Sequence, residues 1–332
     1  MNPTLIYPGI YRIKLPLAGK KPGPVNVYLF KGKDNITLLD TGTDLTWRYL
    51  EDRLKRIDVK FKDIDRIVMT HGHVDHYGAA KRVLDGGSGR ARVYAHAADA
   101  RPIKTGRDVP SGAYRRFLIS TGTPLRYHLG IVPMFFLFRI KLARPCPVHE
   151  HINVNEPMIL GDYTARVIET PGHTRGSVCF FLEKEGLLFS GDHILGHITP
   201  NAFPMLEKDS LPKRISQKEF YTSLNLIRDI NPAIVHPAHG KMIRDFSLIH
   251  GVYKTCFAQR QDTIYQTIKK HPGKSVYDMA RFHFPEINGS HRFLLDLYLA
   301  VSEIFTHIQV LEDQGRVKTR LINRILHVEN IK

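Results

Sequence analysis

Three histidines and one aspartate occupy six positions directly after an apolar run that is typical of a buried strand. Neutral imidazoles and a carboxylate are borderline-soft ligands that suit Zn, Fe or Mn better than Ca or Mg. His71 and His73 lie two residues apart and can project together from an extended turn, whereas Asp75 and His76 begin the next element and can face a second ion. The spacing therefore predicts a metal site that accommodates two ions better than one. The alternative, a histidine-rich surface turn, explains an isolated His-x-His better than this longer pattern.

The motif lies within a regular alternation of predicted strands and helices. In the first half we predict strands at 10–15, 24–30, 36–42, 67–69 and 91–95, and helices at 45–57 and 78–84. From residue 153 the pattern restarts, with strands at 157–162, 164–169, 177–182, 186–192 and 233–235, and a helix at 220–230. Strands alternating with helices, with candidate ligands at strand ends, indicate a layered α/β fold.

The stretch Thr70–Gly78 resembles the signature of the metallo-β-lactamase-fold hydrolases. Three later segments, 170–174, 190–193 and 236–240, supply that family's remaining ligands in the expected order. The resemblance covers about residues 5–250 and implies the family's four-layer αβ/βα sandwich, so we expect a catalytic domain at 1–250.

The resemblance also implies a ligand set, and it implies hydrolysis. One metal would be held by His71, His73 and His173, the other by Asp75, His76 and His239, with Asp192 bridging the two. The expected cofactors are two divalent ions, Zn first and Fe or Mn as alternatives. A hydroxide shared by such ions is a nucleophile near neutral pH. Asp75 would be the catalytic residue that orients the water and carries its proton.

Two branches of the resembled family fit less well. Flavodiiron-type redox sites replace the second histidine of the motif by an acid, and this chain has His73. The penicillin-hydrolysing branch typically lacks the ligand at His76 and has cysteine where this chain has Asp192. Redox chemistry and antibiotic hydrolysis are therefore not expected.

Several further polar residues lie near the motifs. Asp40 ends a buried strand, where a carboxylate needs hydrogen bonds. It is either a structural turn residue or, as the resemblance implies, a support of the metal loop. His193, His197 and His236 match no ligand position, although one of them could hydrogen-bond a ligand or face the substrate.

Composition limits the class of protein. At 332 residues and 42% hydrophobic residues, the chain can form one large domain and a small one. Three cysteines without a C-x-x-C spacing argue against a disulfide framework and a thiolate metal site, which favours the cytoplasm. We see no signal peptide and expect no transmembrane segment, since no apolar run reaches the length of a span.

Nearly half of the net charge of +16 lies in one segment, residues 101–150, where nine Lys/Arg accompany only Asp108 and Glu150. This segment also contains the apolar, aromatic run 131–142. Three interpretations remain open: a lid helix over the active site, an interfacial membrane or dimer contact, and an ordinary core helix.

After about residue 250 the pattern changes to helices at 255–271, 276–281 and 294–314, followed by a turn and a β-ribbon. This order suggests a winged helix at 251–332, resembling the small C-terminal domain of the β-lactamase-like protein 2 branch. Winged helices often bind DNA, but the segment carries only twelve Lys/Arg against eight Asp/Glu. A packing or homodimer role is therefore favoured over nucleic acid.

Three functions follow from these observations. The favoured one is hydrolysis of a thioester or related acyl ester on an anionic carrier such as coenzyme A, phosphopantetheine or glutathione. The carrier would be gripped by Arg115, Arg116 and Arg126, and the acyl chain would contact Phe135, Phe136 and Phe138. The alternative is a metal-dependent ribonuclease or phosphodiesterase, favoured by the net charge and the predicted winged helix. A binding module without catalysis is disfavoured because no ligand is missing.

Overall fold

The computed structural model describes residues 2–17, 22–107, 109, 112–208, 210–290 and 292–331, so Asp108, counted above in the charge of segment 101–150, lies outside it. The chain divides into two compact units. Unit 1 comprises Met1–Asp108, Phe138–Pro200 and Ser223–Ile249, and unit 2 comprises Val109–Leu137, Asn201–Thr222 and His250–Lys332. Our boundary at residue 250 had assigned 109–137 and 201–222 to the larger domain, whereas the structure groups them with the C-terminal part.

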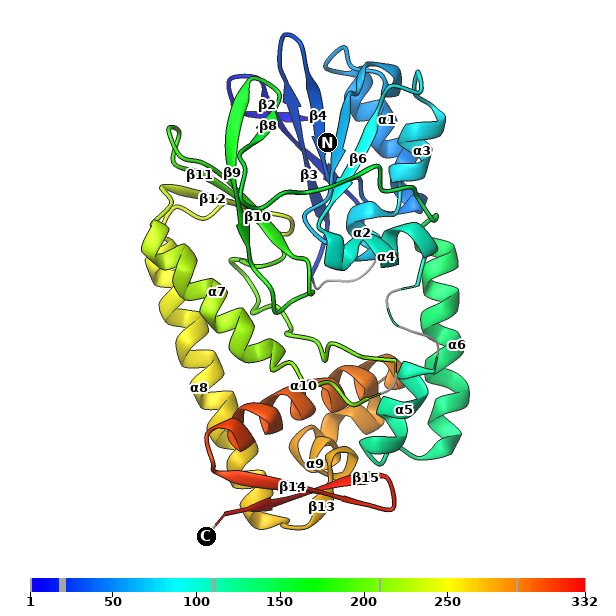
Figure 1. The fold of residues 1–332 in the computed structure, drawn as a ribbon, viewed down its shortest axis with the longest axis vertical. Helices are drawn as coiled ribbons and strands as arrows, with labels where there is room; N and C mark the ends of the chain where they lie inside the picture. Colours follow the sequence, from blue (N-terminus) through cyan, green and yellow to red (C-terminus); the bar gives the residue numbers. More distant parts are fainter. Residues whose placement is uncertain are drawn as a thin grey trace. The chain divides into compact units, whose positions relative to one another are not determined.

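The first sheet of unit 1 has seven strands in chain order (Figure 1). They are β1 (Thr4–Tyr7), β2 (Ile10–Leu15), β3 (Val25–Lys31), β4 (Ile36–Leu39), β5 (Arg66–Val68), β6 (Arg92–Ala95) and β7 (Glu150–His151). Pairing is antiparallel from β1 to β4 and parallel from β4 to β7. The parallel half requires crossovers, which contain η1 (Asp44–Thr46), α1 (Trp47–Lys55), η2 (Phe61–Asp63), α2 (Val74–Tyr77), α3 (Ala80–Asp85) and α4 (Ala97–Thr105).

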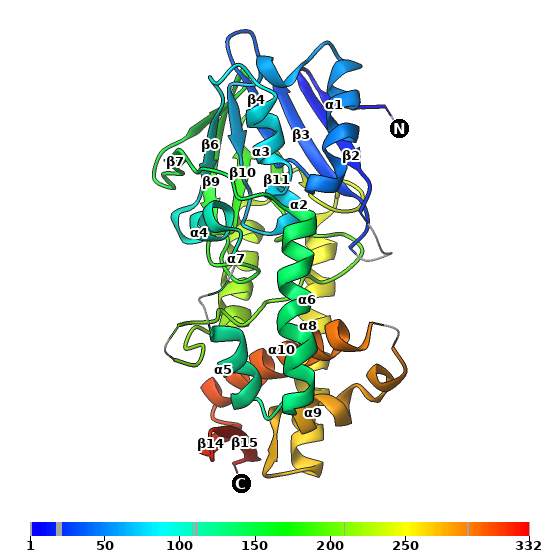
Figure 2. The same ribbon diagram turned by 90° about the vertical axis from the view of Figure 1, so that its right-hand side faces the viewer.

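Strand β3 shows how this sheet is buried on both faces. Val27 and Leu29 belong to the core that the sheet forms with α1 and α3, which cover its outer face (Figure 2). Tyr28 and Phe30 point the other way, into the core shared with the second sheet. Side chains alternate along a strand, so a continuous apolar strand is explained by two apolar layers.

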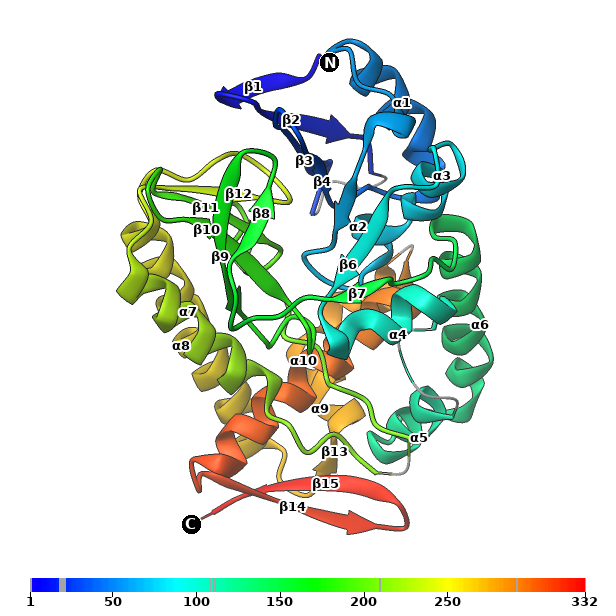
Figure 3. The ribbon, with the colours of Figure 1, turned by 45° about the horizontal axis from the view of Figure 1, so that its top comes forward.

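The second sheet faces the first (Figure 3). Its order is β12-β11-β10-β9-β8, formed by β8 (Met158–Leu160), β9 (Tyr163–Glu169), β10 (Val178–Leu182), β11 (Leu187–Gly191) and β12 (Ile234–Pro237). The C-terminal part of α7 (Ser216–Ile230) follows its outer side, with Leu224 and Ile227 fully buried. Helix, sheet, sheet and helix form the predicted four-layer sandwich.

Unit 2 is built around α10 (Phe293–Asp313), whose buried positions include Leu297, Val301, Ile304 and Ile308. The other elements are α5 (Ala113–Ser120), the first part of α6 (Leu125–Leu142), most of α8 (Phe246–Lys270), α9 (Val276–His283) and η3 (Pro285–Gly289). A three-stranded sheet of order β13-β15-β14 completes it, with β13 (Lys274–Ser275), β14 (Val317–Ile322) and β15 (Ile325–Asn330). The predicted order of three helices and a ribbon is confirmed.

Helix α10 requires one correction. By length and composition it could cross a bilayer, contrary to our expectation that no segment is long enough. However, 61% of its apolar window is buried inside the structure, which is how the core helix of a folded domain looks. The cysteines agree with the prediction, since Cys146, Cys179 and Cys256 are all free.

Segment 101–150 is not one structural piece. It contains the end of α4, all of α5 and α6, and the start of β7. Helix α6 packs Ile131 and Phe135 into the unit 2 core but leaves Leu129 79% and Leu137 64% exposed. An ordinary core helix would not expose such residues, so the lid and contact interpretations remain as predictions.

Candidate metal centre

Strand ends of both sheets of unit 1 supply the predicted ligands. His71 and His73 follow β5, and α2 carries Asp75 and His76. The other three come from the second sheet and follow β9, β11 and β12: His173, Asp192 and His239. All seven side chains gather in one place, as the spacing of the motifs requires.

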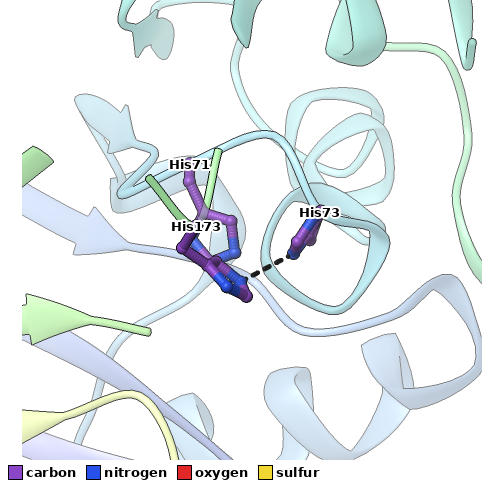
Figure 4. Close-up of side chains that lie close together, drawn as sticks. All are labelled: His71, His73 and His173. Carbon is purple, nitrogen blue, oxygen red and sulfur yellow. Dashed lines mark hydrogen bonds between the residues drawn. The ribbon is translucent and has the colours of Figure 1, made fainter. Parts of the chain in front are cut away.

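The first cluster consists of His71, His73 and His173, whose ligand nitrogens lie within 4.8 Å of one another. Figure 4 shows the three rings turned toward a common point. The nearest nitrogens are His173 Nε2 and His73 Nδ1, 3.0 Å apart. Such a group of imidazoles matches a three-histidine metal site.

The second cluster consists of Asp75, His76 and His239. Asp75 Oδ2 lies 3.4 Å from His239 Nε2, and Asp75 Oδ1 lies 3.8 Å from His76 Nε2. This cluster offers two nitrogens and a carboxylate to a cation.

Asp192 lies between the two clusters. Its Oδ1 is 3.6 Å from His76 Nε2 and 3.4 Å from His239 Nε2, whereas its Oδ2 is 3.6 Å from His173 Nε2. The two oxygens of one carboxylate thus face different clusters. This is the geometry a bridging ligand needs.

Four of these atoms show that the residues fit a metal. His71 Nε2, His76 Nε2, His239 Nε2 and Asp192 Oδ1 are buried and have no hydrogen-bond partner in the described part of the chain. A buried polar atom without a partner costs free energy, and native proteins rarely keep several together. Cations among these atoms would satisfy all four.

The histidine pKa values shift in opposite directions in the two clusters. Burial, reinforced by neighbouring imidazoles, lowers the pKa of His71 well below its usual value and that of His73 to about 3. Both rings are therefore neutral near pH 7, which is the form that binds metals.

At the second cluster, burial opposes protonation, but the carboxylates around His76, that of Asp192 above all, raise its pKa well above the usual value. The pKa of His239 is raised in the same way. Despite burial, the adjacent imidazoles lower the pKa values of Asp75 and Asp192. The carboxylates are thus ionised, and metal binding must displace protons from this side.

In three of the candidate histidine ligands, the Nδ1 atom contacts a neighbouring polar group that orients the ring. His76 Nδ1 lies 2.8 Å from Asp40 Oδ2, and the same oxygen accepts a hydrogen bond from Thr70 Oγ1. His71 Nδ1 lies 3.1 Å from Thr70 Oγ1, and His239 Nδ1 lies 3.0 Å from the carbonyl oxygen of Gly23. Such contacts fix the tautomer and ring orientation of a ligand. These bonds agree with the interpretation of Asp40 as a support of the metal loop, which stays a prediction.

The other nearby histidines stay outside the clusters formed by the described residues. His236 stacks on Phe189, and burial, with nearby arginines, lowers its pKa to about 4. His197 Nε2 lies 2.8 Å from the carbonyl oxygen of Pro22, and His193 is buried. Sequence reasoning missed Asp99, a buried carboxylate in the first turn of α4. An acid at a helix start after a strand of the ligand-bearing sheet was the available signal.

Five of the six predicted substrate residues lie in unit 2, whereas Phe138, like all predicted ligands, lies in unit 1. Arg115 is exposed, and Arg116 donates to the backbone carbonyl oxygens of Glu207 and Lys208. The other three side chains lie on α6: Arg126 covers the ring of Tyr127, Phe135 stacks on Tyr114 in the unit 2 core, and Phe136 is 57% exposed. Their contact with a substrate remains a prediction.

An αβ/βα sandwich that presents histidine clusters and a shared carboxylate at its strand ends defines the class of metal-dependent hydrolases. Residues 21–239 match the family model described as the metallo-beta-lactamase superfamily, and the chain belongs to this superfamily.

Several known proteins are similar to this chain. It is 28% identical over 320 residues to the probable metallo-hydrolase YqjP of Bacillus subtilis, an alignment that covers 93% of this chain and 94% of the relative. It is 27% identical over 255 residues to the beta-lactamase-like protein 2 homologue of Drosophila melanogaster, which covers 76% of this chain and 71% of the relative. An atrochrysone carboxyl ACP thioesterase of Aspergillus fumigatus is 33% identical over 107 residues (32% and 23%). A metallo-beta-lactamase family protein of Thermus thermophilus has the same fold, with a TM-score of 0.80 at 23% identity (98% and 100%). The predicted family, and the resemblance to the β-lactamase-like protein 2 branch, are confirmed.

Proposed function

We propose that this enzyme is a dinuclear metal-dependent hydrolase of thioesters or related acyl esters. The observation that carries the proposal is the position of Asp192, whose two oxygens face different ligand clusters. In this proposal His71, His73 and His173 hold one ion, Asp75, His76 and His239 hold the other, and Asp192 serves both. Zn is the first choice because imidazole and carboxylate suit it.

When bound, such ions supply an activated water and polarise the scissile carbonyl. The protein's own contribution is to hold this chemistry in place. Asp75 is ionised and only 17% exposed, so its carboxylate can orient a water and accept its proton. The cation charge is balanced by Asp75 and Asp192, which are buried among imidazoles.

An acyl thioester as substrate is supported by one relative and by the residues of helices α5 and α6. The relative named a carboxyl ACP thioesterase aligns with about a third of this chain. Helices α5 and α6 provide cations at Arg115, Arg116 and Arg126 and aromatic rings at Phe135 and Phe136. An acyl chain on an anionic carrier needs both kinds of contact. We therefore propose that these arginines contact the carrier and that these rings contact the acyl chain. The cytoplasm is the proposed compartment.

A second candidate, hydrolysis of RNA or another phosphodiester, is favoured by the C-terminal hairpin. Strand β14 and the turn that follows it carry Lys318, Arg320 and Arg324, all exposed, with the acids Glu329 and Glu312 nearby. The hairpin lies in a helix–strand–helix–helix–hairpin arrangement that we propose to be winged-helix-like. Cations on such a hairpin can contact phosphates without reading sequence.

Metal analysis followed by a hydrolysis screen tests both candidates. We expect about two transition-metal ions per chain. His73→Ala should lose metal from the first site, and Asp192→Ala from both, and each should lose activity with the metal. The screen should include acyl-coenzyme A, acyl-phosphopantetheine and acyl-glutathione thioesters, lactones, a phosphodiester and short RNA. Turnover of thioesters supports the first candidate. Turnover of RNA alone supports the second, and full activity without metal contradicts both.

A further inference from the structure

Asp99 connects the two loops that carry the first histidine cluster. Its Oδ2 accepts a hydrogen bond from the backbone N–H of Gly72, which lies between His71 and His73, at 2.8 Å. The same oxygen accepts a bond from Thr174 Oγ1, adjacent to His173, at 2.6 Å. Two loops from different sheets are therefore held by one carboxylate.

The other oxygen of Asp99 completes the connection. Oδ1 accepts from the backbone N–H of Gly176 at 2.9 Å, so the carboxylate takes three donors while only 4% exposed. Hydrogen bonds to a buried charged acceptor are stronger than neutral ones, and removing the acceptor would leave the donors without a partner.

The backbone approaches Asp99 so closely that a side chain at Gly176 would force a shift of its neighbours, and one at Gly72 would be tightly packed. A Cβ added to Gly72 would lie 3.2 Å from Asp99 Cβ, and one added to Gly176 would lie 2.9 Å from Asp99 Cγ and 2.8 Å from His96 Nδ1. His96 caps α4, with its Nδ1 accepting from the N–H of Ala98. The carboxylate is thus presented from a fixed helix start to loops that are packed against it.

We propose that Asp99 is a positioning residue of the first metal site: it sets the distance between the His71–His73 pair and His173. The proposal rests on the proposed two-metal function. Asp99 contacts no ligand side chain in these bonds and acts through the backbone and Thr174. The cluster of Asp75, His76 and His239 receives no such bond from it. Loss of Asp99 should therefore weaken one metal site and spare the other.

The test is calorimetric titration of the metal-free full-length protein with Zn²⁺, checked by competition with a chromophoric chelator. Asp99→Asn keeps the size of the side chain but places an NH₂ group against donors. We expect one of two binding steps to weaken about tenfold to a hundredfold, the range known for groups that orient ligands. Thr174→Val should weaken the same step less, and Thr174→Ser, which keeps the hydroxyl, should restore it.

Double variants locate the affected site. Asp99→Asn should lower the Zn²⁺ affinity of a His73→Ala protein little further, since both changes act on one site. In a His239→Ala protein, Asp99→Asn should lower the Zn²⁺ affinity by its full effect. Asp65→Asn is the matched control, because Asp65 Oδ2 also accepts a backbone N–H, that of Ile36, but at the opposite end of β5. It should lower the melting temperature without changing either binding step.

Two outcomes overturn the proposal and can be told apart. A wild-type chain that takes up no metal removes the proposed function and this inference with it. A wild type with two ions, and an Asp99→Asn with both affinities unchanged and only a lower melting temperature, overturns the inference alone. If Asp99→Asn does not fold, unchanged affinities in Thr174→Val decide against it.

Discussion

His76 Nδ1 and Asp40 Oδ2 are 2.8 Å apart, and both side chains are buried. The contact leaves His76 Nε2 directed toward Asp192. Asp40 itself directly follows β4 in a left-handed backbone conformation, with φ 61°, and its carboxylate accepts hydrogen bonds from Thr70 in the loop of the candidate ligands. A left-handed backbone after this strand therefore holds a candidate ligand of the second cluster in position.

Asp40→Asn should weaken metal binding by about tenfold to a hundredfold, because an amide supplies one acceptor and no charge to His76 and Thr70. The fold should survive, since asparagine tolerates the left-handed conformation. Zinc titration of the metal-free protein measures the effect. Asp58→Asn is the matched control: Asp58 also has a positive φ, 51°, but is exposed. Equal affinities in both variants would contradict the role assigned to Asp40.

Asp75→Asn should lower kcat by on the order of a hundredfold or more, because the amide keeps the shape of the carboxylate but cannot accept a proton. Steady-state kinetics on the best thioester of the screen, with metal content measured on the same sample, checks this. Asp85→Asn, at an exposed carboxylate on α3, should leave the rate unchanged. A normal rate in Asp75→Asn with two ions bound would refute the assignment.

His307 should make stability depend on pH. Burial, with nearby Arg260, lowers its pKa to about 3, and the neutral ring accepts from Gln217 Nε2 while its Nδ1 donates to Gln261 Oε1. The unfolded chain binds a proton near pH 6.5 and the folded chain does not. The stabilisation is therefore complete above pH 6.5 and decreases as the pH falls toward 3, by up to about 1.4 kcal/mol per pH unit.

Urea unfolding of the metal-free protein between pH 7.5 and 5 measures this slope. His307→Gln should be less stable at pH 7.5 but show a shallower loss on acidification. His151→Gln, at an exposed histidine, is the control and should keep the wild-type slope. A wild-type slope in His307→Gln would show that other groups carry the acid sensitivity.

Arg115→Ala/Arg116→Ala separates the two candidate functions. If these arginines bind an anionic carrier, KM for a charged thioester should rise about tenfold or more, because a hydrogen bond to a charged group contributes about 1.5–3 kcal/mol. KM for a neutral ester and kcat should change little. Arg320→Ala/Arg324→Ala, on the hairpin, is the matched variant and should leave thioester kinetics unchanged.

For a nuclease the pattern reverses. The hairpin variant should weaken RNA binding and reduce the slope of log K against log salt by nearly one for each phosphate that the protein no longer neutralises. Salt titrations of RNA binding in both double variants measure this. Steep salt-dependent RNA binding with cleavage and no thioester turnover would replace the acyl hydrolase by the nuclease.

The cluster of candidate ligands could be predicted from the sequence because metal chemistry restricts residue types and because the candidate residues follow apolar strands. His71, His73, Asp75 and His76 are close in the chain, so their proximity is local. His173, Asp192 and His239 came from the family resemblance, and the structure brings them to the same edge.

Tertiary structure alone decided what lies far apart in the chain. Asp99 is 27 residues from Gly72 and 77 from Gly176, and no spacing rule relates these positions. The grouping of 109–137 and 201–222 with the C-terminal part depends on which apolar faces pack together, as with Phe135 against Tyr298. Local sequence patterns show periodicity and the types of candidate ligands. Which group a carboxylate bonds, and which apolar face packs on another, depends on distant segments that come together and exclude water.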